Sequence, residues 1–92
     1  MELDKMYRVK ITHALDFVKV TGGDIDYWNN AERDDWSEGC EEGRRRAADL
    51  LTFMGDQGDP SLLGRVGKAI TMSGRFGSVE TGFFHQIAAN LI

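Results

Sequence analysis

Hydrophobic residues recur every three or four positions along most of the chain, a spacing typical of helices with one buried face. The first such pattern runs from about Asp4 to Val20 and consists of Tyr7, Ile11, Ala14, Leu15 and Val18. Gly22 and Gly23 follow and can end a helix, because glycine adopts the left-handed cap conformation without steric cost. Residues 7–12 also alternate between apolar and polar side chains and are rich in β-branched residues, so a short strand is the alternative interpretation.

A second and longer helical pattern lies between Asp24 and Met54. Its apolar stripe consists of Trp36, Cys40, Ala47, Leu50, Leu51 and Met54. Asn30 or Asp34 is the expected N-cap, since either side chain can accept a bond from a free backbone N–H, and residues 24–30 can form a separate turn. Gly39 and Gly43 lie four residues apart within the pattern. They predict either a kink or, as the simpler interpretation, close packing of another element against bare backbone.

Two further helices are predicted in the last third of the chain. Asp59 and Pro60 form a typical helix start, with an N-cap followed by proline at the first helical position. This helix is expected over residues 60–72, with Leu62, Leu63, Val66, Ala69 and Ile70 on its inner face. After a tight connection over residues 73–77, Ser78 is the expected cap of the last helix. The apolar positions of that helix are Val79, Phe83, Phe84, Ile87, Ala88 and Leu91.

These patterns predict an all-α fold, a small compact bundle of four to five helices with short connections. The runner-up is an α+β fold with a short N-terminal strand or hairpin. A chain of 92 residues can bury one modest core, so residues 1–92 are expected to form a single helical domain.

Composition narrows the range of functions. With 41% hydrophobic and 28% charged residues, the chain is typical of a folded globular protein. Its formal net charge of −4 opposes direct binding to nucleic acid. Cys40 is the single cysteine, so no internal disulfide can form, which fits a reducing compartment. Neither a signal peptide nor a membrane-spanning stretch is recognisable, so we expect the cytoplasm, of a cell or of an infected host.

No catalytic or metal-binding motif is recognisable. Nothing in the spacing places Cys40 beside His13 or His85 as a nucleophile pair, and the Cys-x-x-Cys and His-x-x-x-His spacings that bind metals are absent. Residues 64–69 partly match a phosphate-binding loop but lack its first glycine and the Ser or Thr after Lys68. We therefore expect neither an enzyme nor a metal or cofactor site.

The most uneven feature of the sequence is the charge of residues 24–42. Eight acids and one base, Arg33, give this segment a charge of −7, whereas the rest of the chain sums to +3. Arg44, Arg45 and Arg46 follow directly. The acids and aromatic residues of the segment are the candidate partner-binding residues: Asp24, Asp26, Tyr27, Trp28, Glu32, Asp34, Asp35, Trp36, Glu38, Glu41 and Glu42.

Two interpretations of this segment stand side by side. The first is a solvated helix face, with acids early and arginines late as the helix dipole favours, and with Glu41–Arg45 and Glu42–Arg46 as ion pairs. The second is a docking surface, on which carboxylates steer a basic partner and aromatic side chains are the buried anchors. An acidic face can also stand in for the phosphates of nucleic acid. The second interpretation therefore predicts an inhibitor or adaptor for a basic, nucleic-acid-binding protein, by analogy with small viral anti-defence proteins.

The alternative function is that of a DNA-binding regulator of helix-turn-helix type. Residues 60–75 would then contact DNA, with Arg65, Lys68 and Arg75 at the phosphates. The negative net charge and the lack of polar base-reading side chains in residues 60–72 argue against it. Homo-oligomerisation is compatible with either function, because Phe76, Phe83 and Phe84 exceed what a small core requires and aromatic surface can be shared between copies.

Overall fold

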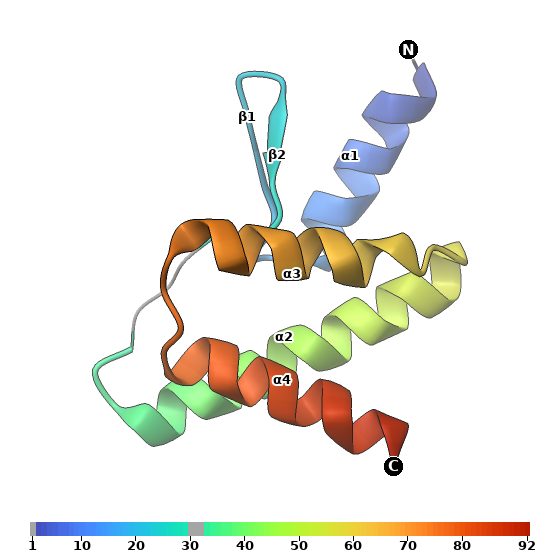
Figure 1. Cartoon of the computed structure of the whole chain (residues 1–92). Helices are drawn as coiled ribbons and strands as arrows, with labels where there is room; N and C mark the ends of the chain where they lie inside the picture. The colour runs from blue at the N-terminus through green and yellow to red at the C-terminus, as the bar shows by residue number, and fades with distance from the viewer. Residues whose placement is uncertain (1, 30–32) are drawn as a thin grey trace.

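The computed structural model describes residues 2–29 and 33–92, which form four helices and one β-hairpin (Figure 1). In chain order the elements are α1 (Glu2–Ala14), β1 (Lys19–Thr21), β2 (Asp24–Asp26), α2 (Trp36–Gln57), α3 (Ser61–Ser73) and α4 (Ser78–Leu91). The all-α prediction is confirmed. A short hairpin is also present, but it follows an N-terminal helix, so residues 6–14 are helical and the strand interpretation of residues 7–12 is wrong.

The first helix is shorter than its apolar pattern predicts. It ends at Ala14, and Leu15, Phe17 and Val18 then enter the core from the connection that leads to β1. Gly22 and Gly23 do not end the helix as expected; they form the turn of the hairpin, where both have positive φ (56° and 97°). A two-residue turn with positive φ at both positions matches the right-handed twist of paired strands, and glycine adopts it without strain.

The N-caps of the later helices lie close to the predicted positions but are other residues. Asp35, rather than Asn30 or Asp34, caps α2, because its Oδ1 accepts the Glu38 backbone N–H at 3.1 Å; Asn30 lies outside the described residues. Asp59 Oδ1 accepts the Ser61 N–H at 3.1 Å, but α3 begins at Ser61, one residue later than predicted, with Pro60 rather than Asp59 in the N-cap position. Ser78 is not a cap but the buried first residue of α4.

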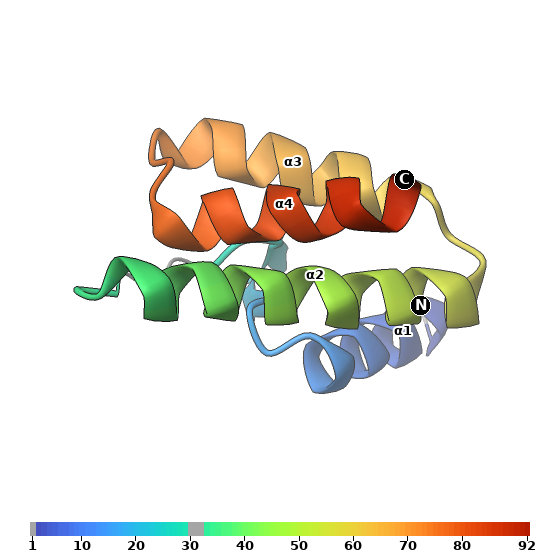
Figure 2. The same cartoon turned by 90° about the horizontal axis from the view of Figure 1, so that it is seen from below.

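The closest packing in the molecule is between α2 and α4, which run parallel and begin at the same end (Figure 2). Gly39 and Gly43 on α2 and Gly82 on α4 lie so close to the opposite helix that a Cβ on any of them would come well within 3.0 Å of a neighbouring atom. For Gly43 and Gly82 that neighbour is backbone. The prediction of close packing against bare backbone is therefore confirmed.

One buried cluster joins all four helices and the hairpin region. It contains Ile11, Leu15, Phe17, Val18, Trp28, Ala47, Leu50, Phe53, Leu62, Val66, Ile70, Val79, Phe83 and Ile87. Five of the apolar positions expected on buried helix faces are exposed instead, namely Ala14, Trp36, Phe84, Ala88 and Leu91. Within the described residues, no helix is long and apolar enough to cross a membrane.

Candidate functional site

The structure divides the predicted docking residues among separate places. Asp24 and Asp26 lie on β2, exposed, and Asp26 Oδ1 accepts the Trp28 backbone N–H at 3.1 Å. Tyr27 is half-buried at the end of the hairpin and accepts a hydrogen bond from Arg65 at 3.3 Å. Glu32 lies outside the described residues. The described residues therefore form no continuous acidic face over positions 24–42.

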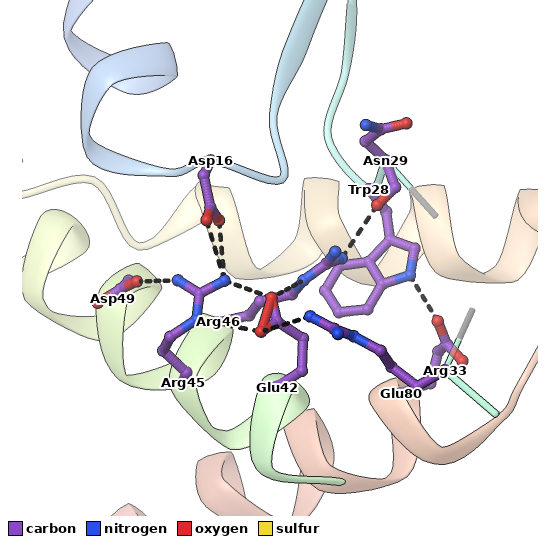
Figure 3. Close-up of polar contacts among 9 residues, drawn as sticks. All are labelled: Asp16, Trp28, Asn29, Arg33, Glu42, Arg45, Arg46, Asp49 and Glu80. Atoms are coloured by element: carbon purple, nitrogen blue, oxygen red, sulfur yellow. Dashed lines mark hydrogen bonds and ion pairs between the residues drawn. The ribbon is translucent and has the colours of Figure 1, made fainter. Parts of the chain in front are cut away.

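Trp28 is a core residue, and the expectation that it anchors a partner is wrong. Its side chain is 3% exposed, and its indole N–H donates to Glu80 Oε2 on α4 at 2.7 Å (Figure 3). Its ring also packs against Phe17 and Phe83, with centroids 5.5 and 5.0 Å apart. Glu80, itself 3% exposed, accepts the Gly77 N–H through Oε1 at 2.6 Å. The buried carboxylate of Glu80 thus links Trp28 to the start of α4.

Arg46 is buried against the ring of Trp28, although an arginine in a charged run is usually solvated. The Cζ atom of its guanidinium lies 4.7 Å from the centroid of the Trp28 ring, and the guanidinium donates a hydrogen bond to the Asn29 carbonyl at 3.1 Å. Burial lowers the pKa of Arg46, and Glu42, with Oε1 3.5 Å from Arg46 Nε, opposes that shift. The predicted Glu42–Arg46 pair exists, but it belongs to the interior and not to a solvated face.

Glu42 is also engaged by Arg45, so it is not available for docking as predicted. Arg45 bonds Glu42 and reaches Asp16 at 3.0 Å and Asp49 at 2.9 Å (Figure 3). The hydrogen bond from Arg45 is the main cause that holds the pKa of Glu42 below its ordinary value. The same bond raises the pKa of Arg45. The predicted Glu41–Arg45 pair is replaced by this Glu42–Arg45 pair.

Five of the predicted residues are exposed within residues 34–41, around the start of α2, and we call them the acidic tip: Asp34, Asp35, Trp36, Glu38 and Glu41. The Trp36 side chain is 62% exposed. Among the described residues, the ion pairs are made by Glu42, Asp16 and Asp49 and by none of the four carboxylates of the tip. Glu38 and Glu41 border a hollow of about 440 Å³ that Arg33, Glu42 and Arg45 complete.

A second exposed aromatic residue lies at the same end of the molecule. Phe76, in the connection between α3 and α4, is 64% exposed and stacks on Phe84 with centroids 5.7 Å apart. Figures 1 and 2 both place this connection at the end where α2 begins, and Gly39 packs against Ser78 there. Sequence reasoning assigned Phe76 to contacts between copies and did not place it near Trp36.

The residues that the structure describes include no group of three or more His, Cys, Asp or Glu side chains placed to hold a metal ion. Comparisons with protein-family models, with curated proteins and with solved structures return no match. The function is therefore inferred from the geometry of this chain alone.

Proposed function

We propose that the chain is a protein–protein interaction module that docks its acidic tip on a basic protein surface. The observation that carries the proposal is the exposure of Trp36 among four exposed carboxylates at one end of the molecule. Tryptophan is among the side chains that contribute most to binding energy at protein interfaces, provided that the partner encloses it. The tip therefore combines an apolar anchor with charges that select the partner.

The local structure of α2 explains part of this arrangement but not all of it. Asp35 caps the helix, and Glu38 in its first turn is favoured by the helix dipole. Neither effect requires a large aromatic side chain in water at position 36. A docking surface accounts for both features, because the carboxylates steer a basic partner and the tryptophan is buried on contact.

The chemistry of the tip favours a partner that otherwise binds nucleic acid. Carboxylates projecting from a helix start present negative charge to lysines and arginines much as phosphates do. A protein that occupies such a basic surface either blocks the binding of nucleic acid there or links the basic protein to another molecule. We therefore place the chain among inhibitors or adaptors of basic, nucleic-acid-binding proteins.

The test uses a short lysine homopolymer as a defined basic probe and follows tryptophan emission. Binding at the tip should shift the emission of Trp36 to shorter wavelength and should weaken steeply as salt is added. The variant Asp34→Lys/Glu38→Lys should reduce the affinity at least tenfold. The variant Trp36→Phe should lose the emission shift.

A matched control keeps the overall charge equal. Asp24→Lys/Asp56→Lys also raises the formal net charge from −4 to zero, but it changes exposed residues on the hairpin and at the end of α2. It should bind the probe more tightly than the tip variant. Equal binding by the two variants would show that only net charge matters and would overturn the proposal.

A DNA-binding function remains as the second candidate, supported by the composition of α3. The helix carries exposed Arg65 and Lys68 and has no acid over residues 61–73. Fluorescence anisotropy with a labelled DNA duplex at low salt tests it. We expect no binding at micromolar protein, because the net charge is negative; binding that is lost in Arg65→Glu/Lys68→Glu would establish this function instead.

A further inference from the structure

A hollow with exposed aliphatic side chains lies between α1 and the hairpin, away from the tip. It has a volume of about 510 Å³, which is within the ~300–1,000 Å³ range of small binding sites. Its lining consists of Arg8, Val9, Thr12, Val18, Lys19 and Val20. Val9 is 56% exposed and Val20 39% exposed, so water covers aliphatic surface here. We call this hollow the valine groove.

The residues that line the valine groove include two bases, Arg8 and Lys19, and no acid. Between residues 6 and 20 the chain has three bases, Arg8, Lys10 and Lys19, and one acid, Asp16. Asp16 is already paired with Arg45, whereas Arg8 and Lys19 take part in none of the ion pairs among residues 6–29 and 33–92, whose side chains the structure describes. Lys19 faces Asp26 across the hairpin, which offsets part of its charge. The groove thus suits an apolar side chain with carboxylates beside it.

The acidic tip has these properties, and it lies elsewhere on the molecule. In Figure 1 the hairpin and α1 rise at the top of the view, whereas α2 begins at the lower left. We infer that the occupant of the valine groove is the acidic tip of a second copy of this chain, with Trp36 against Val9 and Val20. Arg8 and Lys19 then meet the carboxylates that flank the tryptophan. This inference rests on the proposed function, because the same tip makes the contact.

The contact joins two different surfaces, so it is head-to-tail. Each copy in such a contact still has a free tip or a free groove. Association therefore does not stop at two copies unless the geometry closes a ring. A contact between two identical surfaces would stop at a dimer, and this difference makes the inference testable.

Sedimentation equilibrium from micromolar to millimolar concentration tests it. The mass of the wild type should rise above the 10.3 kDa of one chain as concentration increases, and it should fall again in high salt. Two variants should each stay monomeric, with an association constant at least tenfold lower. One changes the tip, Asp34→Lys/Glu38→Lys, and the other changes the groove, Arg8→Glu/Val9→Gln. Lys19 is kept, since a glutamate there would face Asp26.

The decisive experiment mixes the tip variant and the groove variant in equal amounts. The tip variant retains its groove and the groove variant retains its tip, so the mixture should form a 1:1 complex that cannot grow further. Lys68→Glu/Met72→Gln makes a matched change on the exposed face of α3 and should associate as the wild type does. Circular dichroism checks that each variant is folded, and the single change Val9→Gln replaces the groove variant if that variant is not.

Two results would overturn the inference: a wild type that stays monomeric throughout, or a mixture of variants that stays monomeric. Neither result affects the proposed function, which the lysine homopolymer tests separately. The groove variant should still bind that probe through its intact tip. If the tip variant binds the probe as well as the charge-matched control does, the proposed function fails whatever the state of association.

Discussion

The two tryptophans show how strongly the environment of one residue type can differ within eight positions. Trp28 is enclosed by Phe17 and Phe83 and bonds a buried carboxylate, whereas Trp36 projects from the first turn of α2. From the sequence both are aromatic residues in an acidic stretch. Contacts with residues distant in sequence, such as Glu80, 52 residues along the chain from Trp28, separate their roles.

Removing the indole N–H of Trp28 should destabilise the fold. Trp28→Phe keeps most of the buried ring but leaves Glu80 Oε2 without its partner, at a cost of about 1–3 kcal/mol. Trp36→Phe should change the free energy of unfolding by no more than about 0.5 kcal/mol, as surface changes usually do. Urea unfolding followed by circular dichroism measures both; equal losses would contradict the assignment of Trp28 to the core.

Glu42 should make stability depend on pH in the acid range. Because Arg45 and Arg46 lower its pKa in the folded protein, it stabilises the fold above its ordinary value of 4.5, and this contribution is lost as pH falls through the lowered pKa. Glu42→Gln should therefore reduce the free energy of unfolding at neutral pH, and its difference from the wild type should shrink below pH 4.5. Glu41→Gln, an exposed neighbour, is the control and should show little difference at either pH. A Glu42→Gln effect that does not vary with pH would contradict the pairing.

At the scale of elements, the glycines of the helices fall into two groups. Gly39, Gly43 and Gly82 allow α2 and α4 to approach until backbone meets backbone or Ser78. At Gly64 and Gly67 on α3 and at Gly55 on α2, an added Cβ would have no neighbouring atom within 4 Å. The first group determines the packing of two helices, and the second only weakens the helices that contain it.

Alanine substitutions distinguish these two groups. Gly43→Ala would force a methyl group against the Val79 carbonyl, so we expect a loss of about 1–3 kcal/mol or more. Gly64→Ala should instead stabilise the protein by about 0.5–1 kcal/mol, since alanine is the better helix former and the space is open. Thermal and urea unfolding measure both, and a neutral Gly43→Ala would mean that the helices can separate at little cost.

The whole molecule has a tightly packed part and a loosely attached part. The pair α2 and α4 is packed at backbone distance, whereas the hairpin has strands of three residues that are exposed except for the half-buried Ile25. Small hairpins are marginal by themselves and depend on what they pack against. The hairpin also borders the valine groove, so its stability bears on any binding there.

Native-state hydrogen exchange should reveal this division. Amides in the central turns of α2 and α4 should exchange only at the rate of global unfolding, and those of residues 19–26 should exchange through local opening at lower free energy. Amide exchange read by nuclear magnetic resonance checks it residue by residue. Equal protection of the hairpin and of α2 would show that the molecule opens only as one unit.

The charge distribution of the whole molecule was only partly visible in the sequence. The excess of acids in residues 24–42 is a property of composition, but its arrangement in space is not. Arg45 and Arg46 pair with Glu42, and Asp24 and Asp26 lie on the hairpin. The exposed acids that are left around the start of α2 are those of the acidic tip. The sequence therefore predicted the sign and the approximate place of this exposed charge, but not which residues share it.

Local rules predicted from the sequence four to five helices, the approximate bounds of α3 and α4 and, as one of two alternatives, close packing at Gly39 and Gly43. Helical periodicity and the Asp59–Pro60 start act within a few residues, so they can be recognised without knowing the fold. The tertiary structure alone decided which tryptophan is buried and which arginine lies in the core. Those outcomes depend on contacts between residues far apart in sequence, such as Trp28 with Glu80, and the free energy of such contacts overrides local preference.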